Sequence, residues 1–368
     1  YSMISIVIII SSSAIPSSAA ELRPESPINS IIIRKYMQDQ IDMGPRVPGT
    51  QASLDFSTWL YDTVDSTKWQ ITTQNYTIDD IELRNFWITK AGSPSNVYPK
   101  YIIGAHYDSR LYADKECGVD PSCPPVPGAN DGTSGVAGIL ELMNNIPDEL
   151  ASNIGFVLFD AEDQGGLTLN NLRWDWILGS EYFVSQMSSE QIEATEAFVL
   201  FDMIGDDDLR LPYERGSDAN LITEIWDRAD KLGYGSIFVD EPGPSLIDDH
   251  VPFLKAGIPA IDIIDFTYAE HHTTLDNMDN ISEQSVAIVV DVVLAWLLLD
   301  VAVSLTLTGD YSDLLSTDNS QTSTTIGLSG ESTFSQSDNN RISTTLISSS
   351  LIILVLLGLL IEKKKIKL

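Results

Sequence analysis

The sequence contains few residues that bind metals through sulfur or nitrogen, and few basic residues. Its 368 residues include two cysteines, four histidines, and 21 Lys and Arg against 53 Asp and Glu, which gives a formal net charge of −32. The two cysteines have no pair of histidines near them in the sequence, so they make a poor structural zinc site of the finger type. The acid excess argues against a nucleic-acid partner, because phosphate binding needs clustered Lys and Arg. With 43% hydrophobic residues, the chain still has enough apolar material for a folded core.

The N-terminus carries an apolar run over residues 4–10, followed by Ser and Ala. This pattern is typical of a secretory signal peptide, and we predict one over residues 1–20. The basic residues that usually open such a peptide are missing, so a disordered apolar tail is the alternative. Cys117 and Cys123 stand in a loop rich in Pro and Gly, and an oxidising compartment favours a disulfide between them.

The C-terminus has two parts of contrasting composition. Residues 304–341 are rich in Ser, Thr, Asp and Asn, which predicts a flexible stalk. Residues 342–361 are densely apolar, and twenty residues of helix span about 30 Å, the thickness of a bilayer core. Lysines follow in residues 362–368, so we expect a transmembrane anchor with a cytoplasmic tail. The expected location is the cell membrane with an extracellular catalytic domain; a cleaved sorting tail is the alternative.

The middle of the chain, residues 21–303, alternates short apolar runs with amphipathic ones. This alternation predicts one α/β domain with a largely parallel sheet covered on both faces. The expected strands are residues 101–105, 154–159, 197–201 and 260–264, and the expected helices are residues 135–146, 218–232 and 251–256. The apolar run 286–303 contains Asp291 and Asp300, so we expect a buried helix there rather than a membrane span.

Histidines and acids follow the predicted strands. Because the carboxyl ends of parallel strands form one rim, these side chains are expected to lie together. The residues are His106 and Asp108 after the first strand, Asp160, Glu162 and Asp163 after the second, Asp202 after the third, His271 and His272 after the fourth, and Asp131 from a loop before a helix. Imidazoles with carboxylates are the ligands of a catalytic zinc. A lone Asp at a strand end more often caps a helix. The inference of a metal site therefore depends on all these histidines and acids occurring together at strand ends.

Eight short segments carry a resemblance to a known family. The chain resembles the co-catalytic zinc aminopeptidases that also include the glutaminyl-peptide cyclotransferases. The segments are residues 44–49 (GPRVPG), 104–109 (GAHYDS), 127–135 (PGANDGTSG), 159–163 (FDAED), 178–180 (LGS), 201–205 (FDMIG), 248–254 (DDHVPFL) and 272–277 (HTTLDN). The resemblance implies a three-layer αβα domain with a mostly parallel, mixed central sheet.

The resemblance also implies roles for individual residues and one or two zinc ions. The implied metal ligands are His106, Asp131, Asp163, Asp202 and His272. Glu162 corresponds to the general base, and Asp108 to the carboxylate that orients His106. Asp248 corresponds to an acid that, in the cyclases, joins a network with the positions of Glu162 and Asp202.

Two positions depart from the family pattern. The family often has Glu-Glu where this chain has Glu162-Asp163, so the second ligand is shorter. The cyclases often have Trp where this chain has His271, which puts the usual cyclase pocket wall in question. Trp174 and Trp176 could replace that aromatic surface, or they could simply pack in the core.

The resemblance predicts an enzyme that acts on peptide or protein N-termini. The leading hypothesis is an aminopeptidase that hydrolyses the N-terminal peptide bond by metal-activated water, with Glu162 as the base. The complete ligand set and His271 favour it. The alternative is a glutaminyl-peptide cyclotransferase, which forms N-terminal pyroglutamate and releases ammonia. A non-catalytic receptor ectodomain is a further alternative.

Overall fold

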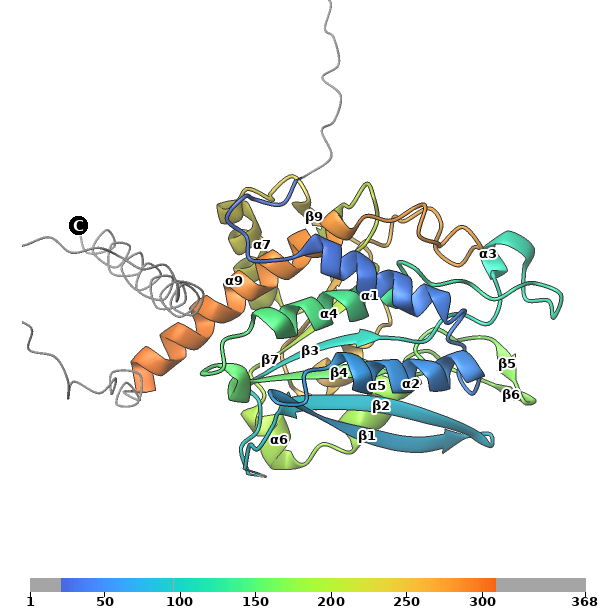
Figure 1. Cartoon of the computed structure of the whole chain (residues 1–368), viewed down its shortest axis with the longest axis horizontal. Helices are drawn as coiled ribbons and strands as arrows, with labels where there is room; N and C mark the ends of the chain where they lie inside the picture. Colours follow the sequence, from blue (N-terminus) through green and yellow to red (C-terminus); the bar gives the residue numbers. More distant parts are fainter. Residues whose placement is uncertain (1–20, 95, 309–368) are drawn as a thin grey trace, which may run out of the picture. The chain divides into compact units, whose positions relative to one another are not determined.

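The computed structural model describes residues 21–94 and 96–308 (Figure 1). The chain divides into two compact units, Tyr1–Trp296 and Leu297–Leu368. The first unit contains every described strand. The predicted signal peptide, the anchor, the cytoplasmic tail and nearly all of the predicted stalk lie outside the described residues, and the domain bounds stay a prediction.

Nine helices and ten strands make up the described residues. The helices are α1 (Ser30–Asp42), α2 (Gln51–Thr63), α3 (Asp114–Cys117), α4 (Thr133–Asn145), α5 (Leu178–Ser185), α6 (Ser189–Ala194), α7 (Ala219–Leu232), α8 (Val251–Ala256) and α9 (Glu283–Thr308), with a 3-10 turn at Ala151–Asn153. The strands are β1 (Trp69–Ile78), β2 (Ile81–Lys90), β3 (Tyr101–His106), β4 (Ile154–Phe159), β5 (Thr168–Leu169), β6 (Leu172–Arg173), β7 (Ala197–Asp202), β8 (Leu211–Tyr213), β9 (Phe238–Pro242) and β10 (Ala260–Ile264).

Six strands form the central sheet in the order β1-β2-β4-β3-β7-β10. β3 pairs in parallel with β4 and β7, and β7 pairs in parallel with β10. These are the four predicted strands. Each of β3, β4 and β7 has six residues, and all of them are buried. β1 and β2 form an antiparallel hairpin that joins β4 in antiparallel register, so the sheet is mixed and mostly parallel.

Helices cover both faces of this sheet (Figure 1). On one face α4 packs on β3 and β7, and α1 packs on α4. The ring of Trp296 in α9 meets Tyr101 of β3 edge to face, with 5.6 Å between centroids. On the other face Phe253 of α8 stacks on Phe198 of β7 at 3.7 Å, and Phe183 of α5 joins the same cluster. The predicted three-layer αβα fold is confirmed.

The ends of α7 and α8 follow the signals in the sequence. Asp218 accepts hydrogen bonds from the amides of Asn220 and Leu221 at the start of α7, as an N-cap does. Gly233 and Gly257 end the two helices with positive φ angles of 91° and 88°, a conformation that glycine adopts without strain. Both helices therefore have their predicted bounds to within one residue.

The buried Asp291 of α9 is neutralised within the fold. Arg23 donates to its two carboxylate oxygens from Nε at 2.6 Å and Nη2 at 3.0 Å, and Ser26 and Tyr234 also bond to it. A buried charge with such partners is stable inside a protein domain but costly in a bilayer. This supports the predicted buried helix for this apolar run.

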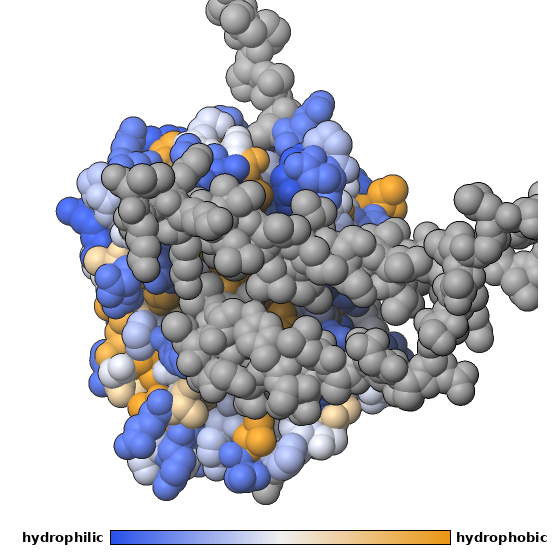
Figure 2. Space-filling model, turned by 90° about the vertical axis from the view of Figure 1, so that its left-hand side faces the viewer, coloured by the Kyte–Doolittle hydropathy of each residue, from blue (hydrophilic) through white to orange (hydrophobic). Residues whose placement is uncertain are grey.

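No helix among residues 21–94 and 96–308 is long and apolar enough to cross a membrane. The predicted location at the cell membrane is corrected on this finding. A transmembrane helix needs about 20 consecutive, predominantly apolar residues, and none of the described helices meets that condition. On the face shown in Figure 2, hydrophilic residues prevail among the coloured atoms, in keeping with the acidic composition.

Candidate metal centre

The parallel strands bring the first group of predicted ligands together. His106 is the last residue of β3 and Asp202 the last residue of β7, its neighbour in the sheet. His106 Nε2 lies 3.1 Å from Asp131 Oδ1 and 3.3 Å from Asp202 Oδ1. These three side chains, all buried, offer ligand atoms that lie within 4.8 Å of one another and could hold one metal ion.

Asp131 also belongs to a second group. Its other oxygen, Oδ2, lies 3.7 Å from Nε2 of both His271 and His272. His272 Nε2 is in turn 3.0 Å from Oδ1 of Asp163. Asp131, His271 and His272 again offer ligand atoms within 4.8 Å of one another. One carboxylate therefore faces both groups, which is the arrangement of a bridging ligand between two ions.

The loop before α4 places Asp131 between the two groups. Asp276 accepts hydrogen bonds from the amides of Asn130 (2.7 Å) and Asp131 (3.2 Å). Gly132 follows with a φ of 90°, and a Cβ there would lie 2.8 Å from the carbonyl oxygen of Asp108 and 3.1 Å from the His106 ring. Only glycine fits this position.

Asp108 holds the segment after β4 in place. Its carboxylate accepts hydrogen bonds from the amides of Glu162 (3.0 Å) and Asp163 (3.2 Å) and from the side chain of Gln164 (3.0 Å). It also lies 3.5 Å from Nδ1 of His106, the side opposite the metal-facing nitrogen. Asp108 therefore connects one predicted ligand to the predicted base.

Three residues in or beside these turns have left-handed backbone conformations. The φ angles are 60° at Ala161, just before Glu162, 44° at Met203, just after Asp202, and 60° at His272. Such conformations cost about 1 kcal/mol or more for residues other than glycine. Strained backbone of this kind is common at active sites, and here it occurs at or beside three predicted functional residues, Glu162, Asp202 and His272.

Burial and like charge shift the pKa values of the acids behind the ligands. Burial raises the pKa of Glu162 well above its usual value, and the nearby Asp248 raises it further. Burial and the charge of Asp202 raise the pKa of Asp248 to about 7. Burial alone would lower the pKa of His272, but the Asp163 and Asp114 carboxylates raise it to about 9. Several buried acids therefore lie close together at this centre, and they repel one another unless a cation is bound.

The donor set fits zinc. Among the described residues, Asp163 Oδ2 is a buried carboxylate oxygen that has no hydrogen-bond partner. A buried carboxylate oxygen without a partner is costly unless a cation neutralises it. Carboxylates and imidazoles without thiolates are the ligands of catalytic rather than structural zinc sites.

The three predicted pocket residues lie in different surroundings. Trp176 is partly exposed and stacks on His272, with 6.2 Å between ring centroids. Lys115 Nζ lies 2.6 Å from Nδ1 of His271; an ammonium can only donate, so His271 carries its proton on Nε2 and faces the centre as a donor. Trp174 is buried in a core cluster with Tyr76, which supports the packing alternative for it.

Several residues near the centre have no role in the sequence prediction. Asp276 accepts the amide of Asp131, Arg110 donates to Asp163, and Asp114 contacts His272. Asp276 stands in one of the segments that carry the family resemblance, so its position could have suggested a role. Conversely, His250 lies outside both ligand groups. It is fully buried, with Nε2 3.4 Å from Glu214 Oε2 and Nδ1 4.0 Å from Asp262 Oδ2.

The family model described as Peptidase family M28 matches residues 88–297, more than half of the chain. The chain belongs to this family. All the predicted ligands, the predicted base and β3, β4, β7 and β10 lie within the matched residues.

Relatives of this M28 chain include peptidases and cyclases. Aminopeptidase YwaD of Bacillus subtilis is 27% identical over 212 residues, which are 52% of this chain and 39% of that protein. The chain thus spans about two-fifths of the length of this curated relative. A Zn-dependent exopeptidase from Parabacteroides distasonis is 28% identical, with a TM-score of 0.64 over 73% of this chain and 98% of that one.

Porphyromonas gingivalis glutaminyl cyclase is 29% identical, with a TM-score of 0.64 over 74% of this chain and 98% of that one. Together these comparisons confirm the predicted family, the prediction of an enzyme and zinc as its cofactor. The comparisons include both reactions that the sequence left open.

Proposed function

We propose that this chain is a zinc-dependent enzyme acting on the N-terminal residue of peptides, and that it cyclises N-terminal glutamine to pyroglutamate. The carrying observation is that Glu162, Asp202, Asp248 and Asp262 are all buried behind the metal centre, where the charge of Asp248 raises the pKa values of Glu162 and Asp262. The likeness to the Porphyromonas gingivalis glutaminyl cyclase, 29% identical, is in keeping with this reaction.

Cyclisation moves a proton but consumes no water. The N-terminal amine of the substrate attacks the side-chain amide carbon, the new C–N bond closes the ring, and ammonia leaves. Zinc, when bound, polarises the amide carbonyl. Asp131, Asp163 and His272 would hold it, with His106 and Asp202 available for a second ion.

Glu162 would move the proton from the amine to the departing ammonia. A carboxyl suits this role when its pKa lies near the working pH, and burial together with Asp248 raises the pKa of Glu162. Asp248, with its own pKa raised to about 7, would stabilise the protonated form of this pair of acids. His271, with its proton on Nε2, would donate to the substrate.

Hydrolysis of the N-terminal peptide bond is the second candidate, favoured by a different observation. Asp131 lies between His106 and Asp202 on one side and His272 and Asp163 on the other, which suits a pair of ions that activate water and stabilise the oxyanion. Glu162 would then take a proton from water. The likeness to aminopeptidase YwaD supports this reaction.

One experiment separates the two reactions. The full chain, loaded with zinc, is incubated with a Gln-initiated and a Leu-initiated peptide, and the products are followed by mass spectrometry. We expect the first peptide alone to lose ammonia. Release of the first residue from either peptide would instead establish the peptidase, and no change in either peptide would refute both.

The matched variant is Glu162→Gln. It should lose nearly all turnover while the amount of bound zinc per chain stays unchanged, because Asp163 rather than Glu162 is the proposed ligand. Loss of zinc from this variant would show that the roles of the two residues are reversed.

A further inference from the structure

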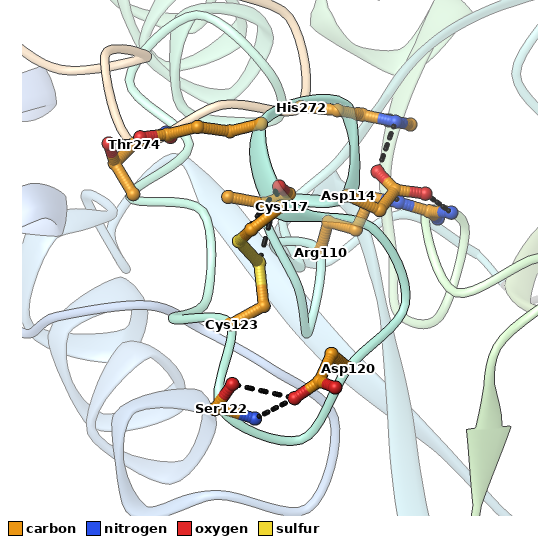
Figure 3. The surroundings of a disulfide bond; sticks show 10 residues. Arg110, Asp114, Cys117, Asp120, Ser122, Cys123, His272 and Thr274 are labelled. Carbon is orange, nitrogen blue, oxygen red and sulfur yellow. Dashed lines mark hydrogen bonds and ion pairs between the residues drawn. A yellow bond between two sulfur atoms is a disulfide. The ribbon is translucent and has the colours of Figure 1, made fainter.

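A short loop, closed by a disulfide, lies against the segment that carries His271 and His272. This disulfide loop comprises residues 113–124, and Cys117 at the end of α3 is bonded to Cys123 (Figure 3). The amide of Ala113 donates to the carbonyl of Pro124 at 2.8 Å, which closes the loop at its base. Ala113, Cys123 and Val126 form a small buried cluster beneath it.

Consecutive side chains of α3 each hold one residue of the histidine segment, 271–274. Lys115 Nζ lies 2.6 Å from His271 Nδ1. Asp114 Oδ1 lies 3.3 Å from His272 Nδ1. Glu116 Oε2 accepts both the amide and the hydroxyl of Thr274 at 2.8 Å. Three consecutive residues of α3 thus contact three of the four residues of the histidine segment, although more than 150 residues separate the two in the sequence.

Asp114 also belongs to a closed ring of side chains. Arg110 donates to the two oxygens of Asp114 from Nε (3.0 Å) and Nη2 (2.8 Å), and from Nη1 to Asp163 Oδ1 (3.3 Å). Asp163 Oδ1 contacts His272 Nε2, and His272 Nδ1 contacts Asp114. The ring therefore fixes two proposed ligands, Asp163 and His272, against each other.

α3 cannot keep this position through its own helical structure. It has four residues and no side-chain N-cap, and an isolated helix of that length is unstable because nucleation is unfavourable. Both sulfur atoms contact the carbonyl of Ala113, Cys117 Sγ at 3.5 Å and Cys123 Sγ at 3.3 Å. The covalent closure and the cluster beneath it therefore restrain α3, together with its contacts with Arg110 and the histidine segment.

We propose that the disulfide loop is a positioning element for the metal centre, with Asp114 as the positioning residue for His272. A carboxylate that accepts the Nδ1 proton of a histidine leaves the Nε2 lone pair free for a metal and orients the ring. The inference rests on the proposed role of His272 as a ligand. Opening the disulfide or removing the Asp114 carboxylate should weaken zinc binding by Asp131, Asp163 and His272, and leave the His106–Asp202 group unaffected.

The first test measures zinc affinity of the full chain by competition with a chromophoric chelator. Asp114→Asn should weaken binding of one zinc about 10- to 100-fold, as loss of such an outer carboxylate generally does. Asp114→Glu should recover part of the affinity, because it keeps the carboxylate. Unchanged affinity in Asp114→Asn, or no difference between the Asn and Glu variants, would overturn the proposal.

The matched control is Asp120→Ala. Asp120 lies in the same loop, and its carboxylate accepts hydrogen bonds from the amide (2.8 Å) and the hydroxyl (2.6 Å) of Ser122, as Figure 3 shows. Zinc affinity should not change in this variant; a loss equal to that of Asp114→Asn would mean that general loosening of the loop is responsible and would overturn the specific role of Asp114.

Reduction of the disulfide gives a test without mutation. A phosphine reduces the bond to two thiols, iodoacetamide blocks them, and circular dichroism reports whether the fold persists. We expect weaker binding of one zinc in folded, reduced protein; unchanged affinity would refute the role of the disulfide. His272→Ala is measured in parallel: if it binds zinc like the wild type, the ligand assignment itself fails, which separates failure of the proposed function from failure of this inference.

Discussion

The Arg46 side chain connects three segments around the metal centre without facing the centre itself. Its guanidinium is fully buried and donates to the carbonyls of Tyr107 (3.0 Å) and Gly128 (2.9 Å) and to the hydroxyl of Thr133 (2.7 Å). Burial lowers its pKa to about 10, so it remains charged at neutral pH. The segments after β3 and before α4 are thereby held together.

Arg46→Lys should lower the free energy of unfolding by about 2–4 kcal/mol, because an ammonium cannot satisfy the same divergent acceptors. Urea denaturation measures the change. The control is Arg34→Lys, an exposed pair with Glu283, where we expect a change below about 0.5 kcal/mol. Equal effects in the two variants would contradict the structural role of Arg46.

The buried carboxyl of Asp160 should make the free energy of unfolding depend on pH. It is fully buried; Oδ2 accepts the amide of Arg84 at 3.1 Å, and Oδ1 has no partner among the described residues. Burial, with the nearby Asp108 charge, raises its pKa to about 7. The folded protein therefore binds this proton more tightly than the unfolded chain, where the pKa is about 3.9, and stability is lost as the pH rises from about 4 through 7.

The neutral variant Asp160→Asn removes this loss. Its stability relative to the wild type should increase between pH 5 and pH 8, as measured by urea denaturation at both values. If the difference between the two proteins is the same at both pH values, Asp160 does not carry the raised pKa.

At the residue scale, the sequence predicted the side chains that directly follow the strands. It did not predict the side chains that contact those residues. His106 and Asp202 could be placed because each directly follows a buried apolar run. Asp114 and Arg110 could not, because their partners His272 and Asp163 are distant in the sequence and the contacts depend on how loops fold.

At the scale of elements, the separation of α4 from the sheet depends on a glycine. A Cβ at Gly135 would lie 2.3 Å from the carbonyl oxygen of Phe201 and 2.9 Å from Cβ of Ala105. A side chain there would push α4 away from the end of β7, where Asp202 stands. The close packing of helix on sheet thus keeps Asp131 and Asp202 within reach of His106.

Gly135→Ala should destabilise the fold by about 3 kcal/mol, since the contacted atoms include backbone, and should weaken zinc binding. Gly138→Ala on the same helix is the matched control. Its Cβ would meet side-chain atoms at 3.2 Å and 3.3 Å, which can move, and alanine favours the helix by about 1 kcal/mol. Thermal unfolding of both variants tests the prediction; similar melting temperatures would refute it.

Elements with local signals were predictable, and elements without them were not. The caps Asp218 and Gly233 set the bounds of α7. The β1–β2 hairpin turns at Asp79 and Asp80, whose φ angles are 48° and 65°, and its half-exposed strands lack the continuous apolar runs of β3, β4 and β7. The four residues of α3 are too few for a periodic pattern.

At the scale of the whole molecule, the acid excess is partly gathered at one place. Asp131, Asp163, Glu162, Asp202 and Asp248 are all buried around the metal centre. Without a cation their mutual repulsion opposes folding, and a bound cation removes it. Composition alone could predict the net charge but not this concentration of it.

Removal of zinc should therefore destabilise the protein. A site at a zinc concentration 100 times its Kd contributes about 2.7 kcal/mol, equivalent to a fall in Tm of roughly 5–10 °C for a domain of this size. Differential scanning calorimetry with and without EDTA measures the fall. Added zinc should restore the Tm and magnesium should not; an unchanged Tm in EDTA would contradict the assignment.

The contributions to the metal centre come from widely separated stretches of the chain, and this has a consequence for biosynthesis. His106 leaves the ribosome long before His272, and β10, which precedes His272, must pair with β7 before the rim is complete. Parallel pairing across such sequence distances is slow, because loop closure must precede it. The group of Asp131, Asp163 and His272 is therefore complete only after synthesis has passed residue 272, so a zinc ion held by these residues is acquired late, by a nearly finished domain.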